Sequence, residues 1–158
     1  MEIDKDDILR KHARPVTKFD DRLAALLTDM AETMRAGDGL GLAAPQVGVL
    51  KRCCVIDMGE AQGLIELVNP EIAAAEGEVT VIEGCLSVPG RAGRMVRPEK
   101  VTVKAQDRFG NPMELHGEGM LAVCMCHEID HLDGVLYVDK MIEDATEEMR
   151  RRQGGGSK

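Results

Sequence analysis

The stretch Met120-Leu-Ala-Val-Cys-Met-Cys-His-Glu-Ile-Asp-His-Leu132 decides how this chain folds. It contains no Pro or Gly and is soon followed by Gly134, a residue type that commonly ends a helix, so it predicts a helix. The residues before His127 are apolar on every side, which is typical of a buried helix. Burying two His, a Glu and an Asp in such a helix is costly unless each has a partner. The stretch therefore predicts a central helix that carries a polar site.

The spacing of the two His indicates a metal site. His127 and His131 are one helical turn apart and share a face of the helix. Two imidazoles so placed can hold one metal ion, and Glu128 beside them can serve as a general base. The alternative is a pair of His on a solvated face with no function, but the apolar surroundings argue against it.

Length and composition describe a single globular domain. The chain has 158 residues, of which 44% are hydrophobic, 30% charged and only 2% aromatic, so its core must be aliphatic. A formal charge of −8 argues against an extended nucleic-acid surface, and we expect no DNA partner. No apolar run reaches the length of a membrane span. Five Cys, an odd number, and an acidic N-terminus without a signal peptide favour the reducing cytoplasm.

Patterns along the chain predict an α+β fold. Asp20 can cap a helix over 21–36. Strands are predicted at 52–57, 64–68, 78–82, 101–106 and 113–117, the last two joined as a hairpin. Residues 37–48 are interpreted as a Gly-rich loop. We expect mostly antiparallel strands around one central buried helix, in a single catalytic domain of residues 1–150 with a flexible Gly-rich tail at 151–158.

Several side chains outside the central helix are predicted to be structural. His12 lies among charged residues and His116 alternates outward in its strand, so both are expected at the surface. Cys53 and Cys54 are adjacent in a strand, and we expect only one of them to face the interior.

A catalytic metal needs a third protein ligand and an open position for water. Cys85 follows a predicted strand in a Gly-flanked turn, which is a rigid place for a thiolate. Cys124 lies three residues before His127 and could approach the same helix face, whereas Cys126 points elsewhere. Spacing alone does not choose among them.

Three stretches together resemble peptide deformylase: Gly39-Leu-Gly-Leu-Ala-Ala-Pro-Gln46, Glu83-Gly-Cys-Leu-Ser87 and His127-Glu-Ile-Asp-His131. Their order and spacing match, from Ile8 to about residue 142. The resemblance implies that Cys85, His127 and His131 bind one divalent metal ion, with Fe²⁺ expected and Zn²⁺, Ni²⁺ or Co²⁺ possible. It implies that Glu128 is the acid/base, and that Gln46 and the backbone N–H of Leu86 stabilise the oxyanion.

The resemblance also implies a substrate, since the family removes the formyl group from the N-terminal Met of nascent peptides. Gly39, Leu40 and Gly41 would pair with the substrate backbone as an added strand. Further substrate contacts and the apolar pocket for the Met side chain would come from Leu40, Val81, Glu83, Gly84, Met120, Val123, Cys124 and His127. Arg150, Arg151 and Arg152 form a basic cluster on an acidic protein, and we expect them to help dock the enzyme on the ribosome.

Two further features accompany the resemblance. Cys126 stands where the family usually has Gln, for which we expect altered packing without loss of activity. Arg97 and Asp130 are expected to form an ion pair that orients the central helix.

Two rival functions remain open from the residues alone. A zinc peptidase would take its third ligand downstream of the helix, from Asp133, Asp139, Glu143 or Asp144. A structural metal module would close its site with a fourth Cys or His.

Overall fold

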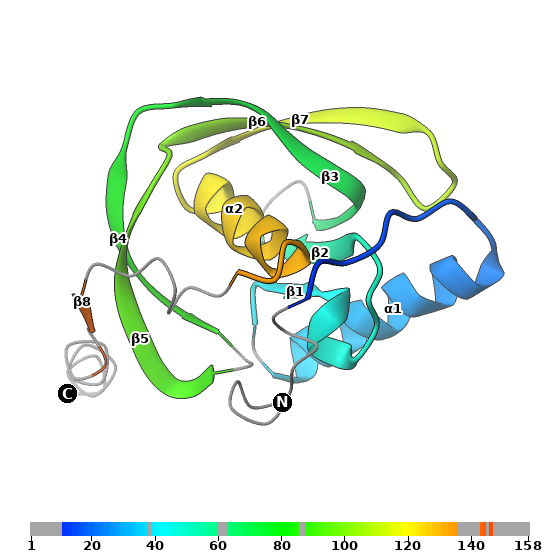
Figure 1. Ribbon diagram of the computed structural model, residues 1–158, viewed down its shortest axis with the longest axis horizontal. Helices are drawn as coiled ribbons and strands as arrows, with labels where there is room; N and C mark the ends of the chain where they lie inside the picture. Colours follow the sequence, from blue (N-terminus) through cyan, green and yellow to red (C-terminus); the bar gives the residue numbers. More distant parts are fainter. Residues whose placement is uncertain are drawn as a thin grey trace.

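Helix α2 (Met120–Leu132) lies at the centre of the molecule, as the sequence predicts (Figure 1). The computed structural model describes residues 11–37, 39–59, 63–85, 88–135, 143–144 and 146, without the side chains of 83–85, 88–91 and 143–144. Most of α2 is buried, and Gly134 follows its end with a φ of 76°, the left-handed conformation that Gly adopts readily. The α+β class with antiparallel strands around this helix is confirmed.

Helix α1 (Asp21–Ala36) is also confirmed at its predicted bounds. Its N-cap is Asp20, whose Oδ1 accepts a hydrogen bond from the backbone N–H of Leu23 at 3.1 Å. The helix lies against β1 and β2 (Figure 1). Its buried apolar stripe includes Leu27, which shares a core with residues of these two strands. The sequence thus determines both ends and the buried face of this helix.

A five-stranded antiparallel sheet has the order β1-β2-β3-β6-β7. Its strands are β1 (Gly41–Ala43), β2 (Cys53–Asp57), β3 (Leu64–Glu76), β6 (Lys100–Gln106) and β7 (Pro112–Glu118). The predicted hairpin of β6 and β7 is confirmed. Residues 37–48 differ from the predicted loop, because they include the short strand β1 and the 3₁₀ helix η2 (Ala44–Val47).

Strand β3 is longer than predicted and changes direction at Asn69. Its first half pairs with β2, its second half pairs with β6, and the register shifts between Val68 and Glu71. Asn69 has a φ of 52°, and its side chain holds both the N–H and the C=O of Val16, at 2.7 and 2.9 Å. A bulge of this kind bends a strand. The bend lets β3, β6 and β7 arch over α2 (Figure 1).

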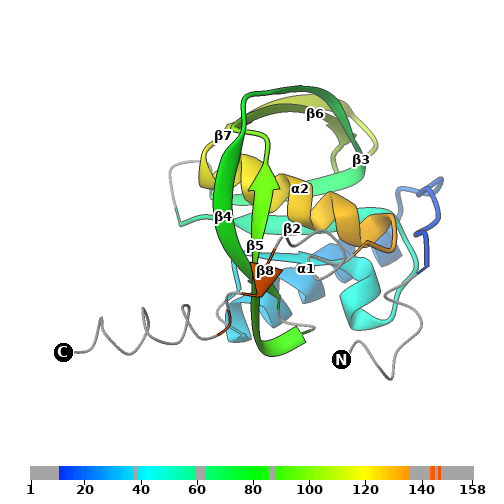
Figure 2. The ribbon, with the colours of Figure 1, turned by 60° about the vertical axis from the view of Figure 1, so that its left-hand side comes forward.

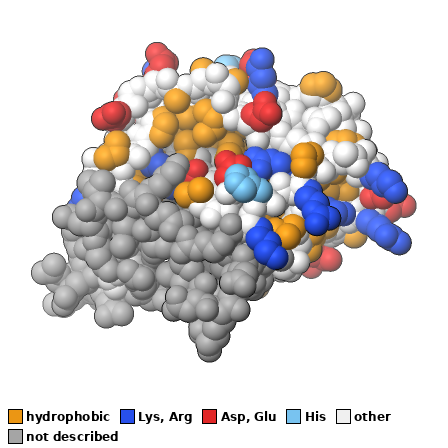
Figure 3. All heavy atoms as spheres, viewed as in Figure 1, with side chains coloured by type: hydrophobic (Ala, Val, Ile, Leu, Met, Phe, Trp, Pro, Cys, Tyr) orange, Lys and Arg blue, Asp and Glu red, His pale blue; other side chains and the backbone are white. Residues whose placement is uncertain are grey.

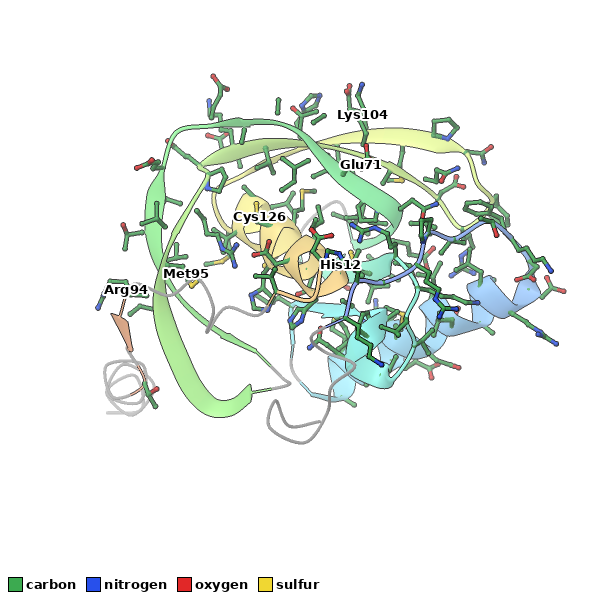
Figure 4. All side chains as sticks on the ribbon, viewed as in Figure 1. His12, Glu71, Arg94, Met95, Lys104 and Cys126 are labelled. Carbon is green, nitrogen blue, oxygen red and sulfur yellow. The ribbon has the colours of Figure 1, made fainter. Side chains whose placement is uncertain are left out.

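A second antiparallel sheet covers another side of α2. It consists of β4 (Val79–Cys85), β5 (Val88–Arg97) and β8 (Glu143–Asp144), in that order (Figure 2). Strand β5 was not predicted, because its Pro and two Gly obscure any alternation. The alternation is nevertheless present in three dimensions: Met95 is buried and points toward α2, whereas Arg94 points away from it (Figure 4).

The two faces of the five-stranded sheet carry separate cores. Side chains that face α1 include Leu42, Cys53 and Val55, whereas the next residues along the strands face α2. Cys53 and Cys54 therefore both face the interior, each fully buried on its own face. The expectation that only one would face inward is wrong, because a helix covers each side of β2.

The two His predicted at the surface, His12 and His116, are found there. The side chains of His12 and His116 are 79% and 73% exposed. On the outer face of the arch, Glu71 of β3 lies opposite Lys104 of β6 (Figure 4). Beneath the arch, hydrophobic side chains gather beside acidic ones (Figure 3).

Within the part of the chain that the structure describes, neither helix is long and apolar enough to cross a membrane. The predicted tail at 151–158 lies outside the described residues.

Candidate active site

Three polar residues of α2 converge in the interior. His127, Glu128 and His131 are all buried, and one ligand-type atom from each lies within 4.8 Å of the others. The rings of the two His meet edge to face, with centroids 4.9 Å apart. Since the two residues are one turn apart, the helix itself creates this proximity. Among the described residues, this is the group able to hold a metal ion.

The spacing of the two imidazoles fits a bound ion. His127 Nε2 and His131 Nε2 are 3.2 Å apart. Two nitrogen ligands that each lie about 2.0–2.1 Å from a tetrahedral ion are themselves about 3.3 Å apart. The nitrogen atoms are therefore already at the separation that a shared ion requires.

Gln46 lies in η2, directly after β1. Its side chain is buried, and its Oε1 accepts a hydrogen bond from the backbone N–H of Ala43 at 2.9 Å. This bond fixes the orientation of the amide group and identifies which end is oxygen. Because η2 packs against α2, Gln46 lies near the helix that carries His127, Glu128 and His131.

The motif that contains Cys85 lies where β4 ends and β5 begins. Cys85 is the last residue of β4, and its backbone pairs with Val88 at the start of β5. The side chains of Glu83, Gly84 and Cys85, and the whole of Leu86, lie outside what the structure describes. The choice of Cys85 as third ligand therefore stays a prediction, as does the oxyanion role of the Leu86 N–H.

Besides Cys85, two cysteines of α2 were candidates for the third ligand. Cys126 is only 3% exposed and belongs to the apolar core on the α2 side. Cys124 is partly buried and packs against the same core. Core packing is the role that the structure supports for Cys126, as expected for a residue next to His127.

The residues expected to contact substrate come from three elements. Leu40 precedes β1 and Met120 begins α2; their exposed fractions are 46% and 52%. Val123 is buried, while Val81 in β4 is partly exposed. Exposed apolar side chains of this kind are compatible with a binding surface, but the pocket itself stays a prediction.

Ion pairs hold α2 in place from two directions. Arg97 Nη1 of β5 donates to Asp130 Oδ2 at 2.6 Å, and the two side chains are 3% and 13% exposed, which confirms the predicted pair. At the end of α2, Arg52 Nη1 donates to the Leu132 carbonyl at 3.0 Å and to Asp133 Oδ1 at 2.9 Å. Sequence reasoning missed Arg52, since its partners lie 80 residues away. A cation at this end also suits the helix dipole.

Asp133 is one of the downstream ligands that a zinc peptidase would require. Its pairing with Arg52 directs it to the end of α2, and it is not part of the group formed by His127, Glu128 and His131. Glu143 and Asp144 belong to β8, but their side chains are not described, and Asp139 lies outside the described residues.

Cys54 lies on the face of β2 that packs toward α2. Burial raises the pKa of its thiol well above the usual value, and the negative charge of Glu128 raises it further. At neutral pH this thiol is therefore protonated. It packs as a small group on the α2 side of β2, near the carboxylate of Glu128.

Comparison with known proteins identifies the family. The profile of the polypeptide deformylase family matches residues 1–147. A peptide deformylase of Caldicellulosiruptor bescii is 59% identical over 155 residues, which are 98% of this chain and 92% of that protein. The crystal structure of a peptide deformylase from Legionella pneumophila superposes with a TM-score of 0.86 at 52% identity, covering 96% of this chain and 89% of that one. One from Synechococcus elongatus, in complex with actinonin, gives 0.85 at 40% identity, over 96% and 84% of the two chains. The chain therefore belongs to the polypeptide deformylase family, metal-dependent enzymes that remove the formyl group from the N-terminal methionine of nascent peptides.

Proposed function

We propose that this chain hydrolyses the formyl group of N-formylmethionyl peptides at one divalent metal ion held by His127, His131 and Cys85. The observation that carries the proposal is the 3.2 Å separation of the two Nε2 atoms on a buried helix, with Glu128 beside them. When bound, a divalent ion supplies Lewis acidity, which makes water nucleophilic at neutral pH.

Glu128 is proposed to move the proton. It follows His127 directly in α2. Its carboxylate therefore lies beside the helix face that carries the two His ligands, and it can accept a proton from the attacking water. The same carboxylic acid can then donate that proton to the leaving amine. Proton transfer by a positioned carboxylate contributes about 10²–10⁴-fold to such reactions.

Gln46 and the backbone N–H of Leu86 are proposed to donate hydrogen bonds to the developing oxyanion. The bond from the Ala43 N–H to Gln46 Oε1 supports this role, because it fixes the amide with its NH₂ group, the donor, at the opposite end. One donor of this kind is worth about 3 kcal/mol in comparable sites.

The edge of the five-stranded sheet is proposed to bind the peptide backbone. Among the described strands, β1 is an edge strand, and a hydrogen bond of 2.9 Å from the Asp57 N–H to the Leu40 C=O extends its pairing with β2. An extended peptide can add to such an edge, here at Gly39, Leu40 and Gly41. The Met side chain would then enter an apolar pocket lined by Leu40, Val81, Met120, Val123, Cys124 and His127, and Glu83 and Gly84 would make further substrate contacts.

A direct assay tests this function. The protein should release formate from a formyl-Met peptide and leave the same peptide without the formyl group intact. Glu128→Gln should keep fold and metal while turnover falls by at least about 10²-fold. Cys85→Ala should lose metal as well as activity. Glu114→Gln, on the exposed strand β7, and Cys53→Ala, on the α1 side, are the matched controls. Cleavage of the internal peptide bond, or normal turnover by Glu128→Gln, would refute the proposal.

Fe²⁺ is proposed as the natural ion, with Zn²⁺, Ni²⁺ or Co²⁺ able to replace it, since a thiolate and two imidazoles do not select among them. The Fe²⁺ enzyme should lose activity in air as iron and Cys85 oxidise, and Ni²⁺ should slow this loss. Equal half-lives for the two forms under oxygen would contradict the assignment.

A cytoplasmic location and docking on the ribosome complete the proposal. Arg150, Arg151 and Arg152, which lie outside the described residues, would contact ribosomal RNA with strong salt dependence. Replacing all three by Ala should weaken sedimentation with ribosomes at low salt. Unchanged binding would remove this part of the proposal and leave the catalytic part intact.

A further inference from the structure

Gly41 lies on the face of β1 that packs toward α2. Its neighbour Leu42 belongs to the core on the α1 side, whereas Ala43 belongs to the core on the α2 side. A Cβ atom built on Gly41 would lie 2.5 Å from Glu128 Oε2 and 3.0 Å from both Cδ and Cγ of Glu128. The carboxylate of Glu128 therefore occupies the space that a side chain at position 41 would fill.

We propose that Gly41 is a positioning residue, whose lack of a side chain lets the Glu128 carboxylate lie against β1 in its working position. The proposal rests on the proposed function for the role of Glu128, but the contact itself is independent of that role. It explains why this position needs Gly although its φ is not positive.

Neither partner can easily retreat. Gly41 pairs with Ile56 of β2, and the next inward residue, Ala43, pairs with Cys54, so β2 backs the strand. Glu128 is only 5% exposed, and its Cγ is as close to the added Cβ as its Cδ. Rotating the terminal carboxylate alone would not relieve the contact. The side chain would have to change rotamer, which moves the carboxylate by more than about 1 Å, a displacement that can cost about 10²-fold in rate.

Gly117 provides a matched comparison. It also packs against α2, but a Cβ there would meet Met125 Sδ at 2.9 Å, with the Ala122 backbone at 3.3 Å. Because the nearest atom belongs to a flexible Met side chain and none of the three nearest atoms belongs to Glu128, we expect Gly117→Ala to leave the carboxylate in place. The two Gly→Ala changes thus add the same methyl group against the same helix, and only one of them displaces the carboxylate.

The kinetic test compares Gly41→Ala with Gly117→Ala on a formyl-Met peptide. Gly41→Ala should lower kcat by about 10²-fold with little change in KM and with metal content retained, whereas Gly117→Ala should stay within a few-fold of the parent protein. If Gly41→Ala instead raises KM and leaves kcat unchanged, position 41 acts through substrate pairing, and the proposal is overturned.

The stability test uses Glu128→Ala as a second background and does not depend on activity. Gly41→Ala should lower the Tm of the parent protein but not that of Glu128→Ala, where the carboxylate is gone and the added methyl group has room. The double variant must fold even if Gly41→Ala alone does not. An equal loss of Tm in both backgrounds, or failure of the double variant to fold, would overturn the proposal. Normal turnover by Glu128→Gln would instead refute the proposed function, and the Tm comparison would still decide whether the contact exists.

Discussion

The two faces of the sheet formed by β1, β2 and β3 differ in what they bury. On the α1 side the core is apolar throughout, with large side chains such as Leu23, Leu27 and Met34. On the α2 side the interior also contains His127, Glu128 and His131. Because side chains alternate along a strand, adjacent residues serve different faces, and one sheet supports a purely structural helix and a site helix at once.

Strand β1 reflects this difference in the size of its residues. Toward α2 it presents Gly41 and Ala43, and toward α1 it presents Leu42, whereas β2 presents Cys54 and Ile56 toward α2 and Cys53 and Val55 toward α1. The small residues of β1 leave room for the carboxylate of Glu128. The comparison teaches that the α1 face is built for stability alone, while the α2 face couples stability to the site.

The largest effect on stability is expected at the ion pair that joins β5 to α2. Arg97→Met should lower the free energy of unfolding by about 3–5 kcal/mol, because it leaves the mostly buried Asp130 carboxylate without its 2.6 Å partner. Metal affinity should fall as well, since Asp130 precedes His131. Urea denaturation and metal titration measure the two quantities. Adding Asp130→Asn should restore part of the stability; a single-variant loss under about 1 kcal/mol would show that the pair is not important.

The second prediction tests the α1 face. Leu27 is fully buried there, and Leu27→Ala should cost about 3 kcal/mol through lost contacts and the cavity left behind. Metal content and kcat at 25 °C should remain those of the parent protein, because the change does not touch the α2 side. A parallel loss of metal affinity would mean that the two faces are coupled, and it would contradict the view that the α1 face contributes to stability alone.

A smaller effect is expected at the start of α1. Asp20→Ala removes the 3.1 Å cap bond to the Leu23 N–H and should cost about 1 kcal/mol. Asp21→Ala, one residue later in the same first turn, makes a matched control that leaves this bond in place. Equal losses in the two variants would assign the effect to helix charge and not to the cap.

The smallest effect is expected in the turn between β6 and β7, which belongs to neither face. Asp107 accepts hydrogen bonds from the N–H groups of Phe109 and Asn111, and chiefly the Asn111 bond lowers the pKa of its carboxyl below the ordinary 3.8. A lowered pKa means that the stabilisation is complete above pH 3.8 and is lost as the pH falls through the folded-state pKa. Asp107→Ala should therefore lower Tm slightly at pH 7, and the difference should vanish in strong acid. A difference that persists there would contradict this account.

The sequence by itself determined the elements whose signals are local. Periodicity and the Asp20 cap defined α1, a stretch without Pro or Gly ahead of Gly134 indicated α2, and turn residues defined the hairpin of β6 and β7. Helical spacing alone brought His127 and His131 together, since residues four apart share a face.

Only the tertiary structure decided the features that depend on partners far along the chain. Strand β5 forms because β4 offers it a ladder, although its own residues carry no strand pattern. Both Cys53 and Cys54 are buried because a second helix covers the other face. The bonds from Arg52 to the end of α2 and the packing of Glu128 against Gly41 join segments 80 to 87 residues apart. Local sequence patterns report propensity and periodicity within one element, whereas these contacts arise only when elements pack against one another.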